Sequence, residues 1–383
     1  MASSLSTDHD NDVKAGLPKC SQKCDPSCAD SAIDILVYIT QSKAFELNAF
    51  QDEIAQQPAA LRHMLARYAG GRMEHLVGRI GTPRRVLIAG MGASFHAALW
   101  ATHVLQARGI WAIAVEASEL LHFSRLLFEG NDCVIVISQS GASAEILPLL
   151  DIVPPGVPVI GITNHPDGAL GSASAVVLPI EAGAETTVAS KTYLNTLACL
   201  WLLAEAWRPG EASESTLSRV PDAVEAIVDA REAIGSLWLE RLSNIERLYF
   251  VGHGPHVATA RQGAMMMGEW VKRPAIAAGI GAFRHGLIEV ADEHCAVVVL
   301  GSGGVTARST ADLSTELAAY GTTVLAVSEG QVVHPARPPV RHFGELLSPL
   351  LDVVPMQVFA ETLARTLGLE PQFRRIAKVV RSI

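Results

Sequence analysis

Residues 133–141 read Cys-Val-Ile-Val-Ile-Ser-Gln-Ser-Gly, and this stretch decides the class of fold. Five consecutive apolar residues that end in small polar residues are typical of a strand buried on both faces and followed by a tight turn. Similar apolar runs occur at residues 85–90 and 157–163, and a helix-length amphipathic stretch at 97–107 separates the first run from 133–137. Strands that alternate with helices indicate an α/β fold whose parallel sheet is covered on both faces.

The second half of the chain repeats this plan. Leu248-Tyr-Phe-Val-Gly-His-Gly254 resembles residues 86–92, and Ala296-Val-Val-Val-Leu-Gly-Ser-Gly303 resembles residues 134–141. Paired positions in both segments are 162 residues apart, as position 252 is from 90 and position 303 from 141. A constant offset over several strands indicates duplication of one α/β domain.

The bulk properties agree with two domains. The chain has 383 residues, of which 49% are hydrophobic, and about 100–200 residues suit one domain with its own core. Its net charge of −9 disfavours nucleic acid and anionic membranes as partners, although a pocket can still be locally positive. No apolar run reaches the ~20 residues that span a bilayer, and the N-terminal residues lack the apolar core of a signal peptide. We therefore expect a cytoplasmic protein that binds neither nucleic acid nor membrane.

Half of the six cysteines lie in a polar leader, at Cys20, Cys24 and Cys28. No nearby histidine gives a recognised zinc spacing, and Pro26 interrupts any helix there. We predict no metal and no cofactor, and we expect the leader to be disordered.

Two loops of the first half are candidates for an anion site. Residues 90–96 and 138–143 each follow a predicted strand and run into a predicted helix. Ligands of open parallel sheets bind beyond the carboxyl ends of the strands, and helix N-termini attract negative charge. Ordinary caps and turns use the same residue types, but two such loops at adjacent strands, with Val188-Ala-Ser190 as a third candidate, favour an anion site. Phe95 stands where a dinucleotide fingerprint needs its third glycine.

The second half carries different candidates. Glu269 follows three methionines on a stretch that otherwise reads as core, and a carboxylate there is costly unless it is paired or used. The alternative is that Glu269 lies on an exposed face. The loop at Ser302 has lost the hydroxyl cluster of the first half, so we expect its phosphate site to be lost too.

Together these segments resemble the isomerase half of glucosamine-6-phosphate synthase (glutamine–fructose-6-phosphate aminotransferase) and its double-SIS relatives, over nearly all of residues 53–383. Gly92-Ala-Ser-Phe-His-Ala97 is similar to the family's Gly-Thr-Ser-Tyr-His-Ala, and Ser138-Gln-Ser-Gly-Ala-Ser143 to its Ser-Gln-Ser-Gly-Glu-Thr. Further similarities join Gly268-Glu-Trp-Val-Lys272 to Lys-Glu-Ile-Ser-Tyr, Gly281-Ala-Phe-Arg-His-Gly-Leu287 to Gly-Glu-Leu-Lys-His-Gly-Pro, and Ile376-Ala-Lys-Val-Val380 to Leu-Ala-Lys-Ser-Val.

The resemblance implies two tandem flavodoxin-like SIS (sugar isomerase) domains, each a parallel sheet flanked by helices. We expect a leader at residues 1–32, a helical segment at 33–70, a first SIS domain at 71–215, a linker helix at 216–242, a second SIS domain at 243–370 and a tail at 371–383 that carries Lys378.

The same resemblance implies roles for individual residues. The sugar phosphate would be held by Gly92, Ser94, Ser138, Gln139, Ser140 and Ser143, with Val188 and Ser190 against the sugar. Glu269 would be the base that moves a proton between C1 and C2. His285 would open the sugar ring from the neighbouring subunit, which implies a homodimer. Lys378 would reach the carbonyl carbon, although by itself it reads as an exposed tail lysine.

Departures from the family pattern affect specificity. Ala93, Ala142 and Ala282 replace a threonine and two glutamates, and Leu287 replaces a proline, so a substrate other than fructose 6-phosphate is expected. The synthase begins with a glutaminase domain whose nucleophile is a cysteine directly after the initiator methionine, whereas residue 2 here is alanine. We expect that this chain does not draw ammonia from glutamine.

The resulting hypothesis is an enzyme that processes a phosphorylated amino sugar by aldose–ketose isomerase chemistry. The first candidate is glucosamine-6-phosphate deaminase, which forms a ketose phosphate and ammonia. The alternatives are a fructosamine-6-phosphate deglycase and a phosphosugar isomerase or aminotransferase without a glutaminase. A non-catalytic sugar-phosphate sensor is least favoured, because regulators of that kind usually have one SIS unit and a DNA-binding domain.

Overall fold

The computed structural model describes residues 49–210, 214–301, 304–333, 342–370 and 372–378. The predicted leader with Cys20, Cys24 and Cys28 lies outside these ranges, as do residues 302–303 of the second-half loop. Of the predicted helical segment, the structure describes the part from Ala49 onward. This part contains helices α2 (Ala49–Ala55) and α3 (Gln57–Tyr68). Helix α4 (Arg72–Val77) begins directly after it.

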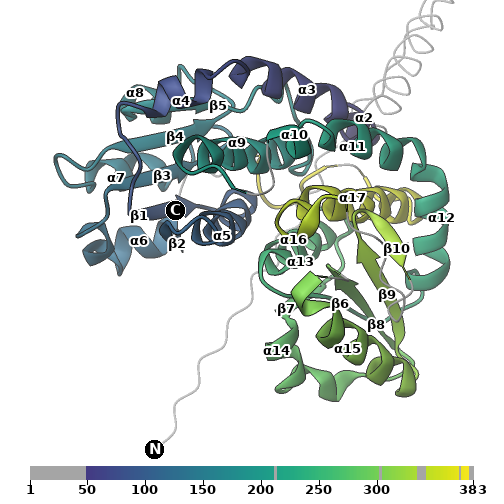
Figure 1. The fold of residues 1–383 in the computed structure, drawn as a ribbon. Helices are drawn as coiled ribbons and strands as arrows, with labels where there is room; N and C mark the ends of the chain where they lie inside the picture. Colours follow the sequence, from purple (N-terminus) through teal and green to yellow (C-terminus); the bar gives the residue numbers. More distant parts are fainter. Residues whose placement is uncertain (1–48, 211–213, 302–303, 334–341, 371, 379–383) are drawn as a thin grey trace, which may run out of the picture. The chain divides into compact units, whose positions relative to one another are not determined.

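Five parallel strands form the sheet of the first half, in the order β2-β1-β3-β4-β5 (Figure 1). The strands are β1 (Arg85–Gly90), β2 (Trp111–Glu116), β3 (Cys133–Ile137), β4 (Val159–Thr163) and β5 (Val176–Pro179). Along β1, Val86 and Ile88 join one core cluster, while Leu87 and Ala89 join another on the opposite face. The predicted flavodoxin-like, doubly covered sheet is therefore confirmed, and its strand order reverses between β1 and β3.

The second sheet repeats this order as β10-β9-β8-β6-β7. Its strands are β6 (Arg247–Gly252), β7 (Ile276–Gly279), β8 (Cys295–Leu300), β9 (Thr323–Ser328) and β10 (Gln331–Val333). The edge strand β10 pairs antiparallel with β9, which differs from the expected all-parallel sheet. The connection consists of Glu329 and Gly330, whose φ angles are +50° and +79°. Such a two-residue turn closes a hairpin, whereas a parallel strand needs a long crossover.

Two equivalent helices join the halves. Helices α5 (Ala93–Gln106) and α13 (Pro255–Met266) each follow the first strand of their sheet, and they pack against each other. Trp100 on α5 is fully buried, and its indole N–H donates a hydrogen bond to the Leu346 carbonyl at 2.8 Å. One core cluster contains residues of both sheets, so the two halves share apolar packing.

Among the helices in the described ranges, one, Gly344–Thr366, is long and apolar enough to cross a membrane. However, 89% of its apolar window is buried inside the protein. Its main part, α17 (Pro349–Thr366), packs against α12 (Arg231–Leu242) and α13. The run is therefore a core helix of the second half.

A close approach of strand and helix is shared by both halves. A Cβ atom at Gly90 would lie 2.8 Å from the carbonyl carbon of Ser94, and a Cβ at Gly252 would lie 2.6 Å from the Cβ of His256. Real Cβ atoms do not approach so closely, so each strand must end in glycine for the helix to begin where it does. This contact fixes Ser94 at the end of β1.

We expect Gly90→Ala to lower the free energy of unfolding by about 1–3 kcal/mol, because the backbone of Ser94 has to move. Gly281→Ala is the matched control, since a Cβ there meets nothing within 4 Å and alanine favours a helix. Urea unfolding of both variants measures the difference. Equal stability of the two variants would contradict the close-approach argument.

Candidate active site

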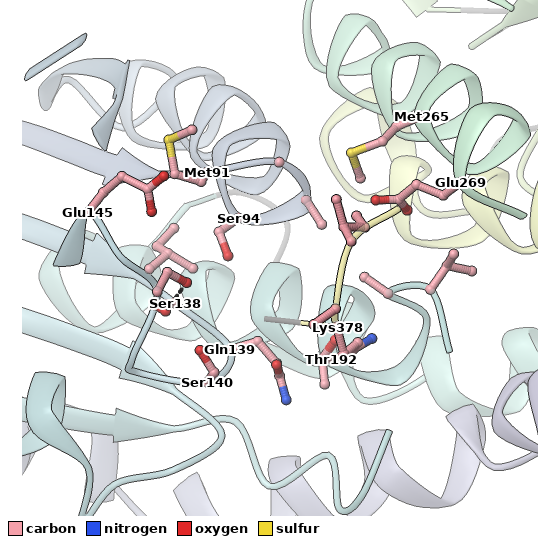
Figure 2. Close-up of a pocket in the computed structure, with 18 of the residues that line it drawn as sticks. Met91, Ser94, Ser138, Gln139, Ser140, Glu145, Thr192, Met265, Glu269 and Lys378 are labelled. Carbon is pink, nitrogen blue, oxygen red and sulfur yellow. Dashed lines mark hydrogen bonds between the residues drawn. The ribbon is translucent and has the colours of Figure 1, made fainter. Parts of the chain in front are cut away.

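A cavity of about 290 Å3 lies at the switch point of the first sheet, near the lower end of the ~300–1,000 Å3 usual for ligand pockets. Its walls come from the loops after β1 and β3, from the region around Glu269 and from the tail between 373 and 378 (Figure 2). The predicted site residues that line it are Gly92, Ser94, Ser138, Gln139, Ser140, Ser143, Val188, Glu269 and Lys378. The fold thus brings nine of the eleven together.

Serine hydroxyls occupy one side of this cavity. Ser94 lies in the first turn of α5, and Ser138 follows β3 directly, with its Oγ 3.4 Å from the Oγ of Ser143. In Figure 2, Ser94, Ser138 and Ser140 lie together, apart from Glu269. Hydroxyl groups and the start of a long helix both favour negative charge, so this side suits a phosphate.

The second loop differs from its prediction in one respect. The helix after it, α7 (Ile146–Asp151), has six residues and begins three residues after Ser143. Within the loop, before Ser143, the Oγ of Ser140 accepts a hydrogen bond from the Ala142 N–H at 3.2 Å. Anion binding at this loop would therefore depend on the serine hydroxyls and the turn, whereas Ser94 lies in the first turn of a long helix, α5.

The opposite side carries a half-buried carboxylate. Helix α13 widens into a π-helical turn, η2 (Met267–Val271), and Glu269 lies within it and lines the cavity. π-Turns occur often at functional sites. Burial raises the pKa of Glu269 above its ordinary value, and the charges of Lys378 and Lys272 only partly oppose this effect. The exposed-face alternative does not describe this residue.

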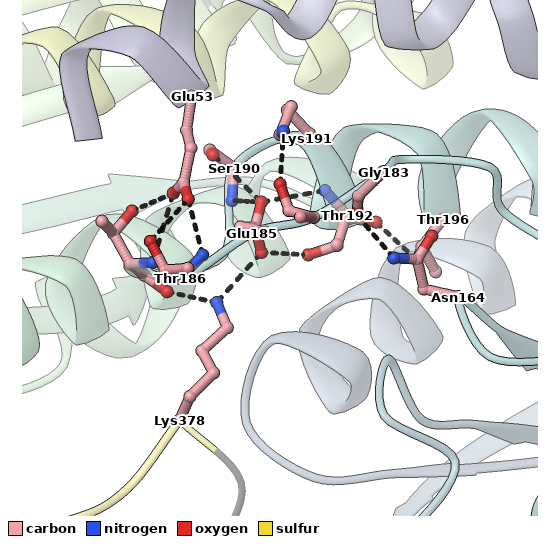
Figure 3. Close-up of polar contacts among 12 residues, drawn as sticks. Glu53, Asn164, Gly183, Glu185, Thr186, Ser190, Lys191, Thr192, Thr196 and Lys378 are labelled. Atoms are coloured by element: carbon pink, nitrogen blue, oxygen red, sulfur yellow. Dashed lines mark hydrogen bonds and ion pairs between the residues drawn. The ribbon is translucent and has the colours of Figure 1, made fainter. Parts of the chain in front are cut away.

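A second carboxylate, Glu185, is buried beneath the cavity floor. Its side chain has no exposed surface, and its oxygens accept hydrogen bonds from the N–H and hydroxyl groups of Ser190 and Thr192 at 2.6–3.1 Å (Figure 3). The Lys378 ammonium lies 3.0 Å away. Burial alone would raise the pKa of Glu185, but Lys378 and these hydrogen bonds outweigh it and hold that pKa below its ordinary value.

The same loop is also held from the N-terminal side. Glu53 on α2 accepts hydrogen bonds from the N–H and hydroxyl groups of Thr186 and Thr187 (Figure 3). The buried Lys191 donates to the Gln56 side chain and to the Ala184 carbonyl, both at 2.6 Å. Loop 183–192 is therefore a firmly held floor, since every polar side chain along it has a hydrogen-bond partner.

Lys378 brings the tail to this floor. Besides its contact with Glu185, its ammonium donates a hydrogen bond to the Thr187 carbonyl. The side chain is 24% exposed and lines the cavity together with Phe373 and Ile376. The ion pair therefore fixes the tail as one wall of the site.

Two predicted site residues lie elsewhere. Ser190 is fully buried, and its hydroxyl donates to Glu185 instead of facing the cavity. His285 follows α14 (Ile280–Arg284), is exposed, and is not part of the lining. A role for His285 in this cavity would need a second copy of the chain, as the family resemblance implies.

The second half fills the equivalent position with its own side chains. His256 stands where the first half has Ser94, and its Nε2 lies 2.9 Å from the Ser348 hydroxyl and 3.1 Å from the Asp352 carboxylate. All three side chains are buried. The Glu345 carboxylate contacts the start of the helix that follows β8, where Thr306 Oγ1 donates to it at 3.0 Å. Internal groups thus occupy the place that the first half leaves open.

Family comparison matches the SIS domain at residues 80–206 and 241–332. The chain belongs to the SIS domain family. Both matched segments coincide with the two repeated sheets, so each half is one SIS unit.

Curated relatives of this SIS chain include the glutamine–fructose-6-phosphate aminotransferase of Pyrobaculum aerophilum, 29% identical over 340 residues that cover 86% of this chain and 56% of that protein. The corresponding protein of Thermus thermophilus is 28% identical and matches 86% of this chain and 58% of its own length. The chain thus spans little more than half the length of these relatives.

Solved structures share the fold of the two SIS units. Glucosamine-6-phosphate deaminase of Thermotoga maritima aligns with a TM-score of 0.72 at 21% identity, over 87% of this chain and 99% of that one. Tagatose-6-phosphate ketose/aldose isomerase of Escherichia coli aligns with a TM-score of 0.74 at 21% identity, over 84% and 94%. At this identity the likeness establishes the fold alone.

Several residues of the SIS site were not predicted from the sequence. Glu145 and Thr192 line the cavity, and so do Met265 and Phe373. Glu185 was also missed, although it lies only three residues before the Val188-Ala-Ser190 motif. The sequence signal for Glu185 was its position among hydroxyl residues, just before the Val188-Ala-Ser190 motif.

We expect Lys378→Met to lower the free energy of unfolding by about 1–3 kcal/mol at neutral pH, because Glu185 keeps its charge without its cation. Glu185→Gln combined with Lys378→Met should recover part of this loss. Urea unfolding of both variants tests the pair.

The effect also depends on pH. Because the folded pKa of Glu185 is depressed, its stabilisation is complete above the unfolded pKa and is lost as the pH falls through the folded pKa. The difference between wild type and Lys378→Met should therefore shrink in acid. A difference that is constant with pH would contradict the ion-pair interpretation.

Proposed function

We propose that this SIS protein transfers a proton between C1 and C2 of a phosphorylated amino sugar and releases its nitrogen, in the simplest case as a hexosamine-6-phosphate deaminase. The observation that carries the proposal is the pairing of serine hydroxyls and the Glu269 carboxylate in one cavity. The serines suit the phosphate at one end of a hexose, and Glu269 suits a carbon-bound proton at the other end. Relatives that act on hexose 6-phosphates support the same substrate class.

The geometry supports a defined sequence of steps. Glu269 removes the C2 proton of the open-chain aldosamine, and the raised pKa of this carboxyl makes it a stronger base than an ordinary glutamate. Return of the proton to C1 gives an imine at C2. Water adds to that carbon and ammonia leaves, so that one hexosamine phosphate and one water give one ketose phosphate and one ammonia.

Cations and a second subunit complete the proposal. Lys378 lies close enough to lower the pKa of Glu269, so its charge can also stabilise an oxyanion on the substrate. We expect His285 of the partner subunit to open the sugar ring, which requires a homodimer. Glu185 and Thr187 keep the Lys378 ammonium in position.

The direct test is incubation of the pure protein with hexosamine 6-phosphates that differ at C2 and C4. Ammonia release and incorporation of solvent deuterium at carbon are expected for at least one of them. If no compound gives either ammonia or deuterium incorporation, the protein is not a hexosamine-6-phosphate deaminase.

Glu269→Gln separates an enzyme from a sensor. We expect kcat to fall by at least about 100-fold, because the general base is lost, while the sugar phosphate still binds to the serine loops. Calorimetric titration measures the binding, and the ammonia assay measures the turnover. Unchanged turnover in this variant would exclude Glu269 as the base.

The pH profile gives an independent check. Since Glu269 must be ionised to act, kcat/KM should fall with decreasing pH, with its inflection above the pKa of an ordinary glutamate. Lys272→Met removes a charge that lowers this pKa, so the inflection should move to still higher pH. An inflection that stays in place would show that another group controls the acid limb.

A further inference from the structure

A second cavity, of about 580 Å3, adjoins the proposed active site. It shares four lining residues with the first cavity, namely Met265, Glu269, Phe373 and Ile376. Glu269 therefore lies at the boundary between the two spaces. None of the serine-loop residues lines the second cavity, so it extends the site on the side opposite to the proposed phosphate.

Positive charge dominates this second cavity. Lys272, Arg273, Arg374 and Arg375 line it, and Glu269 is its only acidic lining residue among those that the structure describes. The concentration of four cations is unusual in a chain with a net charge of −9. We name these four side chains the basic cluster.

The basic cluster has little internal neutralisation. No ion pair within the described ranges includes any of its four members. Arg273 donates to the Ser243 carbonyl at 3.0 Å, and Lys272 donates to the Glu269 carbonyl, which are neutral acceptors. Burial and the neighbouring charge of Arg374 lower the pKa of Lys272, whereas Glu269 raises it. A bound anion would relieve this like-charge crowding.

The backbone of Lys272 is also unusual. Its φ and ψ angles are +59° and 26°, a left-handed conformation, directly after the π-helical turn. The left-handed conformation costs free energy for a lysine. Such conformations persist where the surrounding structure imposes them, frequently at ligand sites. The turn that aims Glu269 into the first cavity thus ends in the residue that presents a cation to the second.

We propose that the basic cluster binds an acidic group carried by the nitrogen of the substrate, so that the preferred substrate is an adduct of a hexose 6-phosphate with an amino acid or another acidic amine. This inference rests on the proposed function, because the phosphate on the serine loops and the C1–C2 end at Glu269 set the direction of the sugar. A substituent on that end leads past Glu269 into the second cavity. A bare ammonium group would leave the cavity empty and would add positive charge beside four cations.

The reaction balances without any redox partner. For a 1-amino-1-deoxyketose 6-phosphate, Glu269 removes a proton from C1 and the proton returns to C2, which leaves an imine between C1 and the nitrogen. Water adds to C1, the carbon–nitrogen bond breaks, and the amine leaves with the proton. One adduct and one water give one aldose 6-phosphate and one free amino acid.

An isosteric pair of substrates tests the charge directly. Fructose 6-phosphate linked at C1 to the nitrogen of glycine carries a carboxylate, and the same adduct of glycinamide carries a neutral amide of equal size. We expect kcat/KM to be about 10- to 100-fold higher for the glycine adduct, as charged hydrogen bonds contribute this much. Hexosamine 6-phosphates are assayed beside them, with release of amine or ammonia as the readout.

Removing the two arginine charges of the tail tests whether they cause the preference for the glycine adduct. Replacing both Arg374 and Arg375 by glutamine should reduce the ratio of kcat/KM between the two adducts to about threefold or less. Arg308→Gln is the matched control, because this arginine is 95% exposed on α15 (Ala307–Ala319) and lines neither cavity. It should leave the ratio unchanged.

The outcomes separate this inference from the proposed function. Equal kcat/KM for the two adducts, or a preserved ratio in the double arginine variant, overturns the acidic-substituent inference alone. Turnover of hexosamine 6-phosphates without turnover of either adduct also overturns the acidic-substituent inference alone. If the basic cluster bound the sugar phosphate instead, kcat/KM would again be equal for the two adducts. No turnover of any of these compounds overturns both proposals.

Discussion

The site depends on one ion pair, between the buried carboxylate of Glu185 and the ammonium of Lys378. A carboxylate without exposed surface needs donors and a counter-charge, and loop 183–192 supplies the donors while the tail supplies the charge. Because Lys378 is held, the tail forms a wall of both cavities and carries Arg374 and Arg375 to the second. The tail wall and two of the four cations of the basic cluster therefore depend on a single buried charge.

The two SIS units solve the same structural problem in opposite ways. Both bring a helix start against the end of their first strand through a glycine, at Gly90 and Gly252. The first unit places Ser94 there and leaves a cavity, whereas the second places His256 there and fills the space with Asp352. The second unit contributes instead through the π-helical turn of Glu269. One fold thus provides an open binding position and a packed one, and the difference lies in a few side chains.

The sequence predicts what is local and misses what is long-range. Buried strands such as β3 are visible as continuous apolar runs, and the serine loops follow from their place after those strands. The edge strand β2 was missed although residues 110–115 form an unbroken apolar run, and β7 has only four residues. Ser190 faces inward because its hydroxyl donates a hydrogen bond to Glu185. The sequence motif alone does not predict this contact. The left-handed Lys272 and the cavity beside it also require the tertiary structure.

The clamps on loop 183–192 have a consequence for biosynthesis. The Glu53 clamp spans 133 residues from Thr186, and the Lys378 clamp spans 193 residues back to Glu185. During translation the first SIS unit can fold early, because domains generally fold as they emerge, and it can acquire the first clamp at once. Glu185 cannot form its ion pair until Lys378 has been synthesised. The nascent chain therefore carries the serine loops before Glu269 and Lys378 have been made, so the cavity gains these parts of its lining only later in synthesis.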